Sequence, residues 1–268
     1  MTAATTARVH IVGAGPGDPE LLTLKSHALI RSADLILHDD LVSAPVLALA
    51  GAQALLANVG KRCGVKKITQ PEINRLMISS AQRGLKVVRL KSGDPGVFGR
   101  LAEELDALEA AGVPYEVVPG ITAGAAAAAS LGVSLTDRRS SSRIVFVSGH
   151  HARENEHREK PDWKSLAAED ATLVVYMPGR DVTGIAHDIL AAGRSVDTPA
   201  VIVSRATTPD QRVWRTTVGE LRDAPLMDAP SILLIGRSLK RASRHLNSQI
   251  LALVDTVTRT SQQRSVSA

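Results

Sequence analysis

The chain has 268 residues, and its composition, 44% hydrophobic and 22% charged, is that of a globular protein and excludes collagen-like and wholly disordered classes. The net charge of +5 suits an acidic partner, but two Trp, two Tyr and two Phe are too few for the base-stacking surfaces that bind single-stranded nucleic acid. No apolar run has the length of a membrane span, and the opening MTAATTAR lacks the apolar region of a secretory signal. We therefore expect a cytoplasmic protein that binds a small polyacid, with no nucleic acid and no membrane as partner.

Cysteine and histidine do not predict a metal site. Cys63 is the one cysteine, so the chain has no intrachain disulfide, and we expect this thiol to be packed rather than nucleophilic. The eight histidines show no metal-ligand spacing, and the pair His150 and His151 has no third ligand nearby in the sequence. The expected metal content is therefore none.

Strands and helices alternate in the first half of the chain. Short runs rich in β-branched residues are separated by stretches of helical period, and they predict strands at 9–12, 35–38, 56–59, 87–91 and 115–118. This alternation is typical of a parallel sheet with crossover helices. The first half is therefore expected to be a parallel-sheet α/β domain.

A polar segment rich in Arg and Ser, 137–142, interrupts this pattern. After it, further strands are predicted at 143–147, 172–177, 200–204 and 231–235. We expect two α/β domains, an N-terminal one over 1–137 and a C-terminal one over 143–242. Apolar residues after Gly236 fit one helical face, so 243–268 is expected to form a C-terminal helix followed by a disordered polar tail.

The first glycine-rich loop, VGAGPGDPELLTL, begins where the first predicted strand ends. It resembles a dinucleotide-binding turn, but Pro16 and Pro19 cannot donate backbone hydrogen bonds and Asp18 would repel a pyrophosphate. Asp18 and Pro19 instead predict the N-cap and first residue of a helix through Leu24. Two alternatives stay open: a purely structural turn, and NAD binding, since Asp39 and Asp40 lie roughly 20 residues downstream, where a ribose-binding acid is expected.

The second loop, SGDPGVFGR at 92–100, also follows a predicted parallel strand. Asp18, Asp39 and Asp94 would share the carboxyl edge of the sheet, where open α/β sheets bind ligands. Three acids at one edge suit a ligand with a positive charge and hydroxyls, such as the sulfonium, ammonium and ribose groups of S-adenosylmethionine. GDPG by itself is also an ordinary turn sequence.

The third loop belongs to VVPGITAGAAAAASLG at 117–132. Pro119 and Gly120 predict a turn, and the alanine run that follows predicts a helix with a small-residue face. Most such helices serve only packing. At the end of the fifth strand, however, Thr122 and Ala123 would lie beside the same edge as the other two loops.

In this order and spacing the motifs resemble those of the class III, tetrapyrrole-type methyltransferases, and the resemblance covers about residues 9–241. The motifs are VGAGPGDPELLTL, HDDLV, VGKRCG, QPEIN, RLKSGDPGVFGR, VVPGITA, VVYMPGR and ATTPDQR. The resemblance implies two α/β domains with a ligand cleft between them, a homodimer, S-adenosyl-L-methionine as cofactor and S-adenosyl-L-homocysteine as product. It places cofactor contacts at Pro16, Ser92, Gly93, Asp94, Val97, Thr122, Ala123, Met177 and Ala206, and more weakly at the backbone near Ser231.

The resemblance also implies the reaction, which is methylation of uroporphyrinogen III at C2 and C7 to give precorrin-2 for sirohaem or cobalamin. It assigns Asp39 as proton acceptor and Lys61 as proton donor, and Arg100 is a further catalytic candidate. The substrate is a polycarboxylate, so basic side chains are expected to bind it, with Lys61, Arg62 and Arg100 as the main candidates. Other basic residues near loop ends are Lys66, Lys67, Arg138, Arg139 and Arg153.

The chain departs from the family at four positions. His38 stands where a tyrosine is usual, Ser92 where a glycine is, Gly96 where a bulky apolar residue is, and Pro71 where a glutamate is. Because Ser92 and Gly96 would line the wall beside the methyl donor, ring position and number of methylations stay open. The alternatives are another precorrin or cobalt-precorrin methyltransferase, an NAD-dependent oxidoreductase, and a tetrapyrrole-binding carrier without activity.

Overall fold

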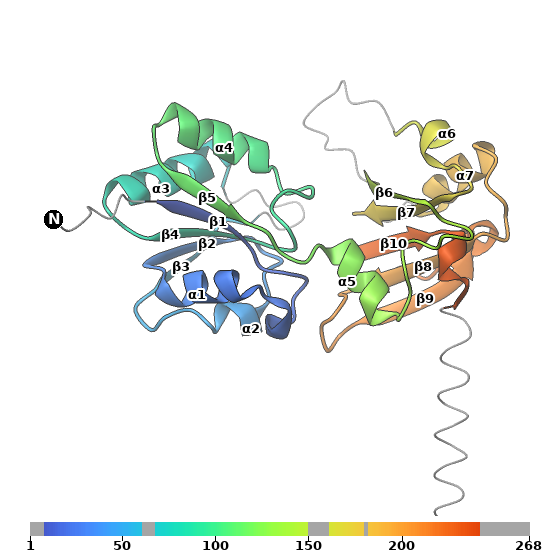
Figure 1. Cartoon of the computed structure of the whole chain (residues 1–268), viewed down its shortest axis with the longest axis horizontal. Coiled ribbons are helices and arrows are strands. Elements are labelled where there is room, and N and C mark those ends of the chain that lie inside the picture. Colours follow the sequence, from blue (N-terminus) through green and yellow to red (C-terminus); the bar gives the residue numbers. More distant parts are fainter. Residues whose placement is uncertain (1–7, 61–67, 150–160, 180–181, 242–268) are drawn as a thin grey trace, which may run out of the picture. The chain divides into compact units, whose positions relative to one another are not determined.

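The computed structural model describes residues 8–60, 68–149, 161–179 and 182–241 (Figure 1). Its contacts group the chain into two compact units: the first runs up to Ala126 and includes Arg205–Gln211, and the second holds Ala127–Ser204 and the chain from Arg212 onward. This grouping differs from the predicted limits of 1–137 and 143–242, because it divides an alanine-rich helix and assigns a short later segment to the first unit. The predicted C-terminal helix and tail, 243–268, lie outside the described residues.

The first unit contains a five-stranded sheet with all strands parallel, as predicted (Figure 1). Its strands are β1 (Val9–Gly13), β2 (Leu35–His38), β3 (Leu55–Asn58), β4 (Val87–Lys91) and β5 (Tyr115–Val118). The strand order is β3-β2-β4-β1-β5, so β1 and β4 are central. Central strands of a parallel sheet are covered on both faces, which explains why their apolar residues run almost without interruption.

The helices of the first unit lie on both faces of the sheet, with α1 and α2 on one side and α3 and α4 on the other (Figure 1). Three of them begin at a side-chain N-cap: Thr23 caps α1, Ser43 caps α2, and Thr69 forms a capping box with Glu72 at α3. The bounds are η1 Pro19–Leu21, α1 Leu24–Ser32, α2 Ala44–Leu47, α3 Gln70–Gln82, α4 Leu101–Ala110 and α5 Ala123–Ser130, of which α5 continues into the second unit.

The second unit has a mixed five-stranded sheet in the order β6-β7-β10-β8-β9. Only β6 and β7 are parallel; the other three neighbouring pairs are antiparallel. The strands are β6 (Arg143–Ser148), β7 (Ala171–Tyr176), β8 (Pro199–Ser204), β9 (Arg212–Thr217) and β10 (Ser231–Ile235). The helical elements are α6 (Trp163–Leu166), α7 (Val182–Ala191), η2 (Val218–Asp223) and η3 (Arg237–Arg241).

Candidate functional site

The three predicted loops converge at the carboxyl edge of the first sheet. Gly15 and Gly93 exchange two backbone hydrogen bonds, with N to O distances of 3.2 and 2.7 Å. A Cβ atom on Gly13 would lie 2.6 Å from the Cα of Gly120, and one on Gly120 would lie 2.3 Å from the carbonyl oxygen of Gly93. The loops therefore pack backbone against backbone, and glycine is required there because a side chain has no room.

Asp94 fastens two of these loops together. Its Oδ1 accepts a hydrogen bond from Gly96 N at 2.8 Å, and its Oδ2 accepts one from Gly120 N at 3.0 Å. Both carboxylate oxygens therefore accept hydrogen bonds from backbone N–H groups. Asp94 shapes the edge directly and adds negative charge to it.

Asp18 is the N-cap of the turn after β1, as predicted: its side chain accepts from Glu20 N at 2.9 Å and Pro19 opens the turn. The predicted continuous helix through Leu24 is wrong. The turn η1 ends at Leu21, Leu22 is extended, and Thr23 caps a separate helix, α1. The strong N-cap preference of threonine decides this break, which the leucine spacing alone does not indicate.

Backbone strain is concentrated in the loops that carry the motifs. Within the described residues, the positive φ values outside glycine belong to Phe98, Arg100, Met177, Arg205 and Thr207. The first two lie in the loop after β4, Met177 follows β7, and the others follow β8. Left-handed backbone costs a side-chain-bearing residue about 1–2 kcal/mol, and such strain is characteristic of ligand-binding loops.

The segment after β8 also contains a buried polar atom that a ligand could satisfy. The Oγ1 atom of Thr207, next to Ala206, is buried and has no hydrogen-bond partner among the described residues. Thr208 lies beside the first glycine loop, since a Cβ on Gly17 would be 2.9 Å from its Cγ2. A buried hydroxyl without a partner costs free energy, which a ligand hydroxyl or amine would recover.

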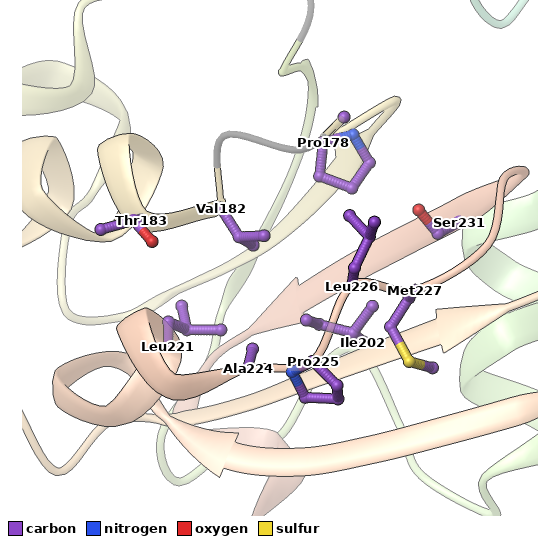
Figure 2. Close-up of a pocket in the computed structure, with 11 residues that line it drawn as sticks. Pro178, Val182, Thr183, Ile202, Leu221, Ala224, Pro225, Leu226, Met227 and Ser231 are labelled. Carbon is purple, nitrogen blue, oxygen red and sulfur yellow. The ribbon is translucent and has the colours of Figure 1, made fainter.

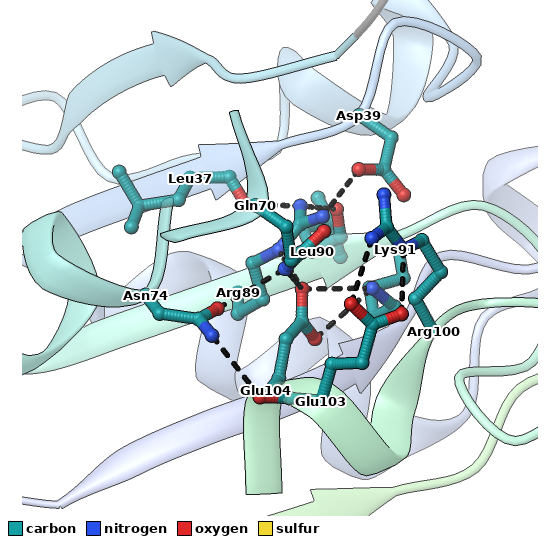
Figure 3. A network of polar contacts seen from close by, with 10 residues as sticks. All are labelled: Leu37, Asp39, Gln70, Asn74, Arg89, Leu90, Lys91, Arg100, Glu103 and Glu104. Carbon is teal, nitrogen blue, oxygen red and sulfur yellow. Dashed lines mark hydrogen bonds and ion pairs between the residues drawn. The ribbon is translucent and has the colours of Figure 1, made fainter. Parts of the chain in front are cut away.

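A buried polar network lies under the loop that follows β2 (Figure 3). Arg89 Nη2 donates to Asp39 Oδ1 at 2.5 Å and Arg89 Nε donates to Glu104 Oε1 at 2.9 Å. Lys91 Nζ lies 3.0 Å from both oxygens of Glu104. Arg89, Lys91 and Glu104 are buried, whereas the side chain of Asp39 is 28% exposed. Asp39 is therefore the member of the network that a ligand can reach.

The pKa values of the two buried cations in this network shift in opposite directions. Burial lowers the pKa of Lys91, and the neighbouring charge of Arg89 lowers it further. Burial also opposes the charge on Arg89, but Asp39 and Glu104 more than offset it and raise the pKa of the guanidinium. Sequence reasoning missed Arg89, Lys91 and Glu104. The available signal was two cations within an otherwise apolar central strand, which require a buried partner.

The remaining predicted residues are placed as follows. Arg100 is the N-cap residue of α4, and its guanidinium donates two hydrogen bonds of 2.7 Å to Glu103. His38 is buried, and its Nδ1 donates to the carbonyl oxygen of Asp39 at 3.0 Å. Thr122 and Ala123 form the start of α5, and Val97 N donates to Asp94 O at 3.2 Å. The residues Lys61, Arg62, Cys63, Lys66, Lys67, His150, His151 and Arg153 lie outside the described part of the chain.

Met177 belongs to the second unit, and this unit also contains a pocket (Figure 2). Met177 is 48% exposed at the end of β7, and the next two residues, Pro178 and Gly179, line a pocket of about 190 Å³. Most of its lining side chains are apolar, and Ser231 and Thr183 are the polar ones. Ligand pockets are commonly lined by apolar side chains together with a few polar groups that orient the ligand.

The described residues contain neither a membrane-spanning helix nor a metal-binding cluster. None of their helices is long and apolar enough to cross a membrane. No group of three or more His, Cys, Asp or Glu side chains among them could hold a metal ion.

Curated relatives cover most of this chain. A siroheme synthase of Tolumonas auensis is 44% identical over 92% of this chain and 50% of its own length. A uroporphyrinogen-III C-methyltransferase of Bacillus subtilis is 44% identical over 85% of this chain and 90% of its own. The chain thus spans about half the length of the siroheme synthases it matches and nearly all of the Bacillus enzyme.

A solved structure gives the same result. The uroporphyrin-III C-methyl transferase of Thermus thermophilus, crystallised with S-adenyl homocysteine, has a TM-score of 0.74 at 39% identity, covering 87% of this chain and 93% of that one. The model of the tetrapyrrole (corrin/porphyrin) methylases matches residues 8–222, which include the three glycine-rich loops. The chain therefore belongs to the tetrapyrrole (corrin/porphyrin) methylases.

Proposed function

We propose that the chain is an S-adenosylmethionine-dependent C-methyltransferase that methylates uroporphyrinogen III at C2 and C7 to give precorrin-2. The main support for the proposal is the arrangement of residues at the carboxyl edge of the first sheet. There, three glycine loops interlock, Asp94 adds negative charge, and the partly exposed Asp39 is held by the buried Arg89. The names of the Bacillus and Thermus relatives support the substrate and the cofactor class.

When bound, S-adenosylmethionine supplies an electrophilic methyl group on a sulfonium. Pro16, Ser92, Gly93, Asp94, Val97, Thr122, Ala123 and Ala206 are the residues of the first unit that we propose to contact it, with Met177 in the second unit. Carboxylates and carbonyls suit this cationic ligand better than they suit a pyrophosphate. We also assign the adenine ring to the pocket beside Met177, because the pocket is apolar and includes Ser231.

The protein's own contribution is alignment and charge. Methyl transfer to a pyrrole carbon needs carbon, methyl and sulfur in line, and rigid interlocked loops are suited to hold that geometry. The transfer leaves positive charge on the ring. Asp39 stabilises that charge or removes the proton, Lys61 is the proposed proton donor, and Lys61, Arg62 and Arg100 bind the substrate carboxylates. Cytoplasmic location and a homodimer complete the proposal, and light scattering of the purified protein tests the dimer.

The proposal is tested by anaerobic incubation with methyl-labelled S-adenosylmethionine and uroporphyrinogen III, following label and mass of the tetrapyrrole. We expect a gain of two methyl groups. One methyl group, or transfer only to a later precorrin, would assign the chain to another step of tetrapyrrole methylation. Macrocycle binding without cofactor binding would indicate a carrier, and NADH fluorescence on titration would favour an oxidoreductase.

Matched variants test the assigned carboxylate in the same assay. Asp39→Asn should lower turnover strongly while S-adenosylhomocysteine still binds, because Asp39 is assigned to the ring and not to the cofactor. Asp106→Asn, an exposed aspartate on α4, is the control and should keep full turnover. Undiminished turnover in Asp39→Asn removes the assigned role.

A further inference from the structure

Asp39 is fixed from three sides. Its backbone N–H donates to Leu90 O at 3.2 Å, and its carbonyl oxygen accepts from Val42 N at 3.2 Å and from His38 Nδ1 at 3.0 Å. Its carboxylate binds Arg89 through Oδ1. The other carboxylate oxygen, Oδ2, makes no hydrogen bond with the described residues. The backbone of Asp39 is therefore anchored independently of its side chain, and among the described residues only Arg89 orients the carboxylate.

Arg89 has no freedom to follow a moving carboxylate. Its Nε is bound by Glu104, and its Nη1 donates to the carbonyls of Leu37 and Leu90 at 3.2 and 3.3 Å. These contacts leave Nη2 directed at Asp39 (Figure 3). A planar guanidinium whose Nε and Nη1 are already bound presents Nη2 in a fixed direction, which a flexible ammonium cannot do.

Glu104 is fixed in turn by the surrounding donors. Lys91 Nζ bonds both of its oxygens, and Gln70 Nε2 on α3 lies 3.4 Å from Oε1. Asn74 on the same helix donates to Glu103 O at 3.0 Å, which ties α3 to α4. The support for Arg89 thus extends across two helices and the central strand.

Charge balance in the network also depends on Asp39. Arg89 and Lys91 are two buried cations, whereas Glu104 is one buried anion. An unbalanced buried charge is costly, so the anionic form of Asp39 is the natural fourth member. The network therefore favours a carboxylate held at the edge of the sheet.

We propose that Arg89 is a positioning residue, which holds the Asp39 carboxylate in one orientation so that its unbound oxygen faces the reacting ring. This inference rests on the proposed methyl transfer. Arg89 does not touch the substrate and acts only through Asp39. Lys91 and Glu104 hold Arg89 in place.

The test compares Arg89→Lys, Asp39→Asn and the double variant in methyl transfer from S-adenosylmethionine to uroporphyrinogen III. We expect Arg89→Lys to lower kcat by about tenfold while KM for S-adenosylmethionine stays within about twofold, because a misplaced catalytic group affects the chemical step. The double variant should be no slower than Asp39→Asn, since both changes remove the same interaction. Losses that multiply in the double variant would overturn the proposal.

Arg194→Lys is the matched control for loss of a buried arginine. Arg194 is 3% exposed and donates to the carbonyls of Ala167 and Ala171 in the second unit. Its replacement should lower the melting temperature and leave kcat unchanged. If Arg89→Lys behaves in the same way, Arg89 is only structural and the proposal fails.

A measurement without substrate separates this inference from the proposed function. The side-chain Nε–H signal of Arg89 in a ¹⁵N–¹H spectrum, assigned by its loss in Arg89→Lys, should shift in Asp39→Asn and stay unchanged in Asp106→Asn. An unmoved signal in Asp39→Asn contradicts the contact. Wild-type protein that transfers no methyl group but shows the shift refutes the proposed function alone.

Discussion

The carboxylate of Asp94 and the backbone N–H of Gly120 join two loops that are far apart in the sequence, with 3.0 Å between Oδ2 and N. Its second oxygen accepts from Gly96 N at 2.8 Å. One side chain therefore sets the shape of the loop after β4 and also its position against the loop after β5. Substitutions here test whether the shape of the edge determines cofactor affinity.

Asp94→Asn should lower both stability and cofactor affinity. An amide keeps one acceptor oxygen but points its NH₂ at the other backbone donor, so one charge-assisted hydrogen bond is lost at a cost of about 1–3 kcal/mol. Urea unfolding measures the first effect, and titration calorimetry with S-adenosylhomocysteine measures the second. Asp106→Asn on α4 serves as control. Wild-type affinity in Asp94→Asn would show that the loop junction does not shape the cofactor site.

Gly120→Ala should disrupt the same junction sterically. The added Cβ would lie 2.3 Å from Gly93 O and 2.9 Å from the Cα of Gly13, so at least one loop must move. We expect the unfolding free energy to fall by about 1–3 kcal/mol, which is the usual cost of overpacking. Loss of S-adenosylhomocysteine binding should accompany it in calorimetry.

Gly112→Ala is the matched control for Gly120→Ala. Gly112 has φ of +62°, and a Cβ there meets nothing within 4 Å, so its replacement isolates backbone strain. This variant should lose about 1–2 kcal/mol and keep its affinity for S-adenosylhomocysteine. Equal affinity losses in the two variants would contradict a specific role for the junction.

Much of the fold, and of the loop edge of the first sheet, was predictable because the sequence signals that determine them are local. Alternating β-branched runs predict the parallel sheet, and glycine with proline at strand ends predicts the loops. Strand β9 was missed, because its apolar residues, Val213 and the exposed Trp214, are adjacent and its other residues are Arg and Thr, so no apolar-polar alternation exists. The antiparallel pairing of β10 with β7 and β8 joins segments far apart in the sequence, so no short window of sequence reveals it. The same holds for Arg89, whose partner Glu104 comes from the next helix.

Arg100 combines backbone strain with a proposed substrate contact, and two variants separate them. Its φ is 55°, a value that glycine adopts freely, and its guanidinium binds Glu103. Both Arg100→Ala and Arg100→Gly should raise KM for uroporphyrinogen III, because both remove the cation. Arg100→Gly should be more stable than Arg100→Ala by about 1 kcal/mol, because it removes the strain. An unchanged KM in both variants would show that Arg100 serves only to begin α4.

Filling the pocket of the second unit tests the adenine assignment. Ala224 lines the pocket at the end of η2 (Figure 2), and Ala224→Leu would place three extra carbons in its volume of about 190 Å³. We expect the dissociation constant for S-adenosylhomocysteine to rise by about tenfold, while the melting temperature changes little. Ala191→Leu on the exposed side of α7 is the control. Unchanged affinity in Ala224→Leu places the adenine ring elsewhere.

The ion pair of Asp170 predicts how stability depends on pH in the acid range. Hydrogen bonds from Arg143 and Ser142 hold the pKa of Asp170 at about 2, below its ordinary value of 3.8. The folded state therefore binds this proton less readily than the unfolded state. The pair contributes stability above pH 3.8, and this contribution is lost as the pH falls toward about 2. Asp170→Asn removes it, so the difference in unfolding free energy between wild type and variant should shrink over that interval.

Urea unfolding at several pH values measures this difference, and added salt should reduce it because the pair is exposed and screened. Asp223→Asn is the control, because its contact with Arg222 is 3.5 Å long and both side chains are exposed. Its difference from wild type should change less with pH than that of Asp170→Asn. A difference for Asp170→Asn that stays constant down to the lowest pH would show that Arg143 does not favour the charged carboxylate.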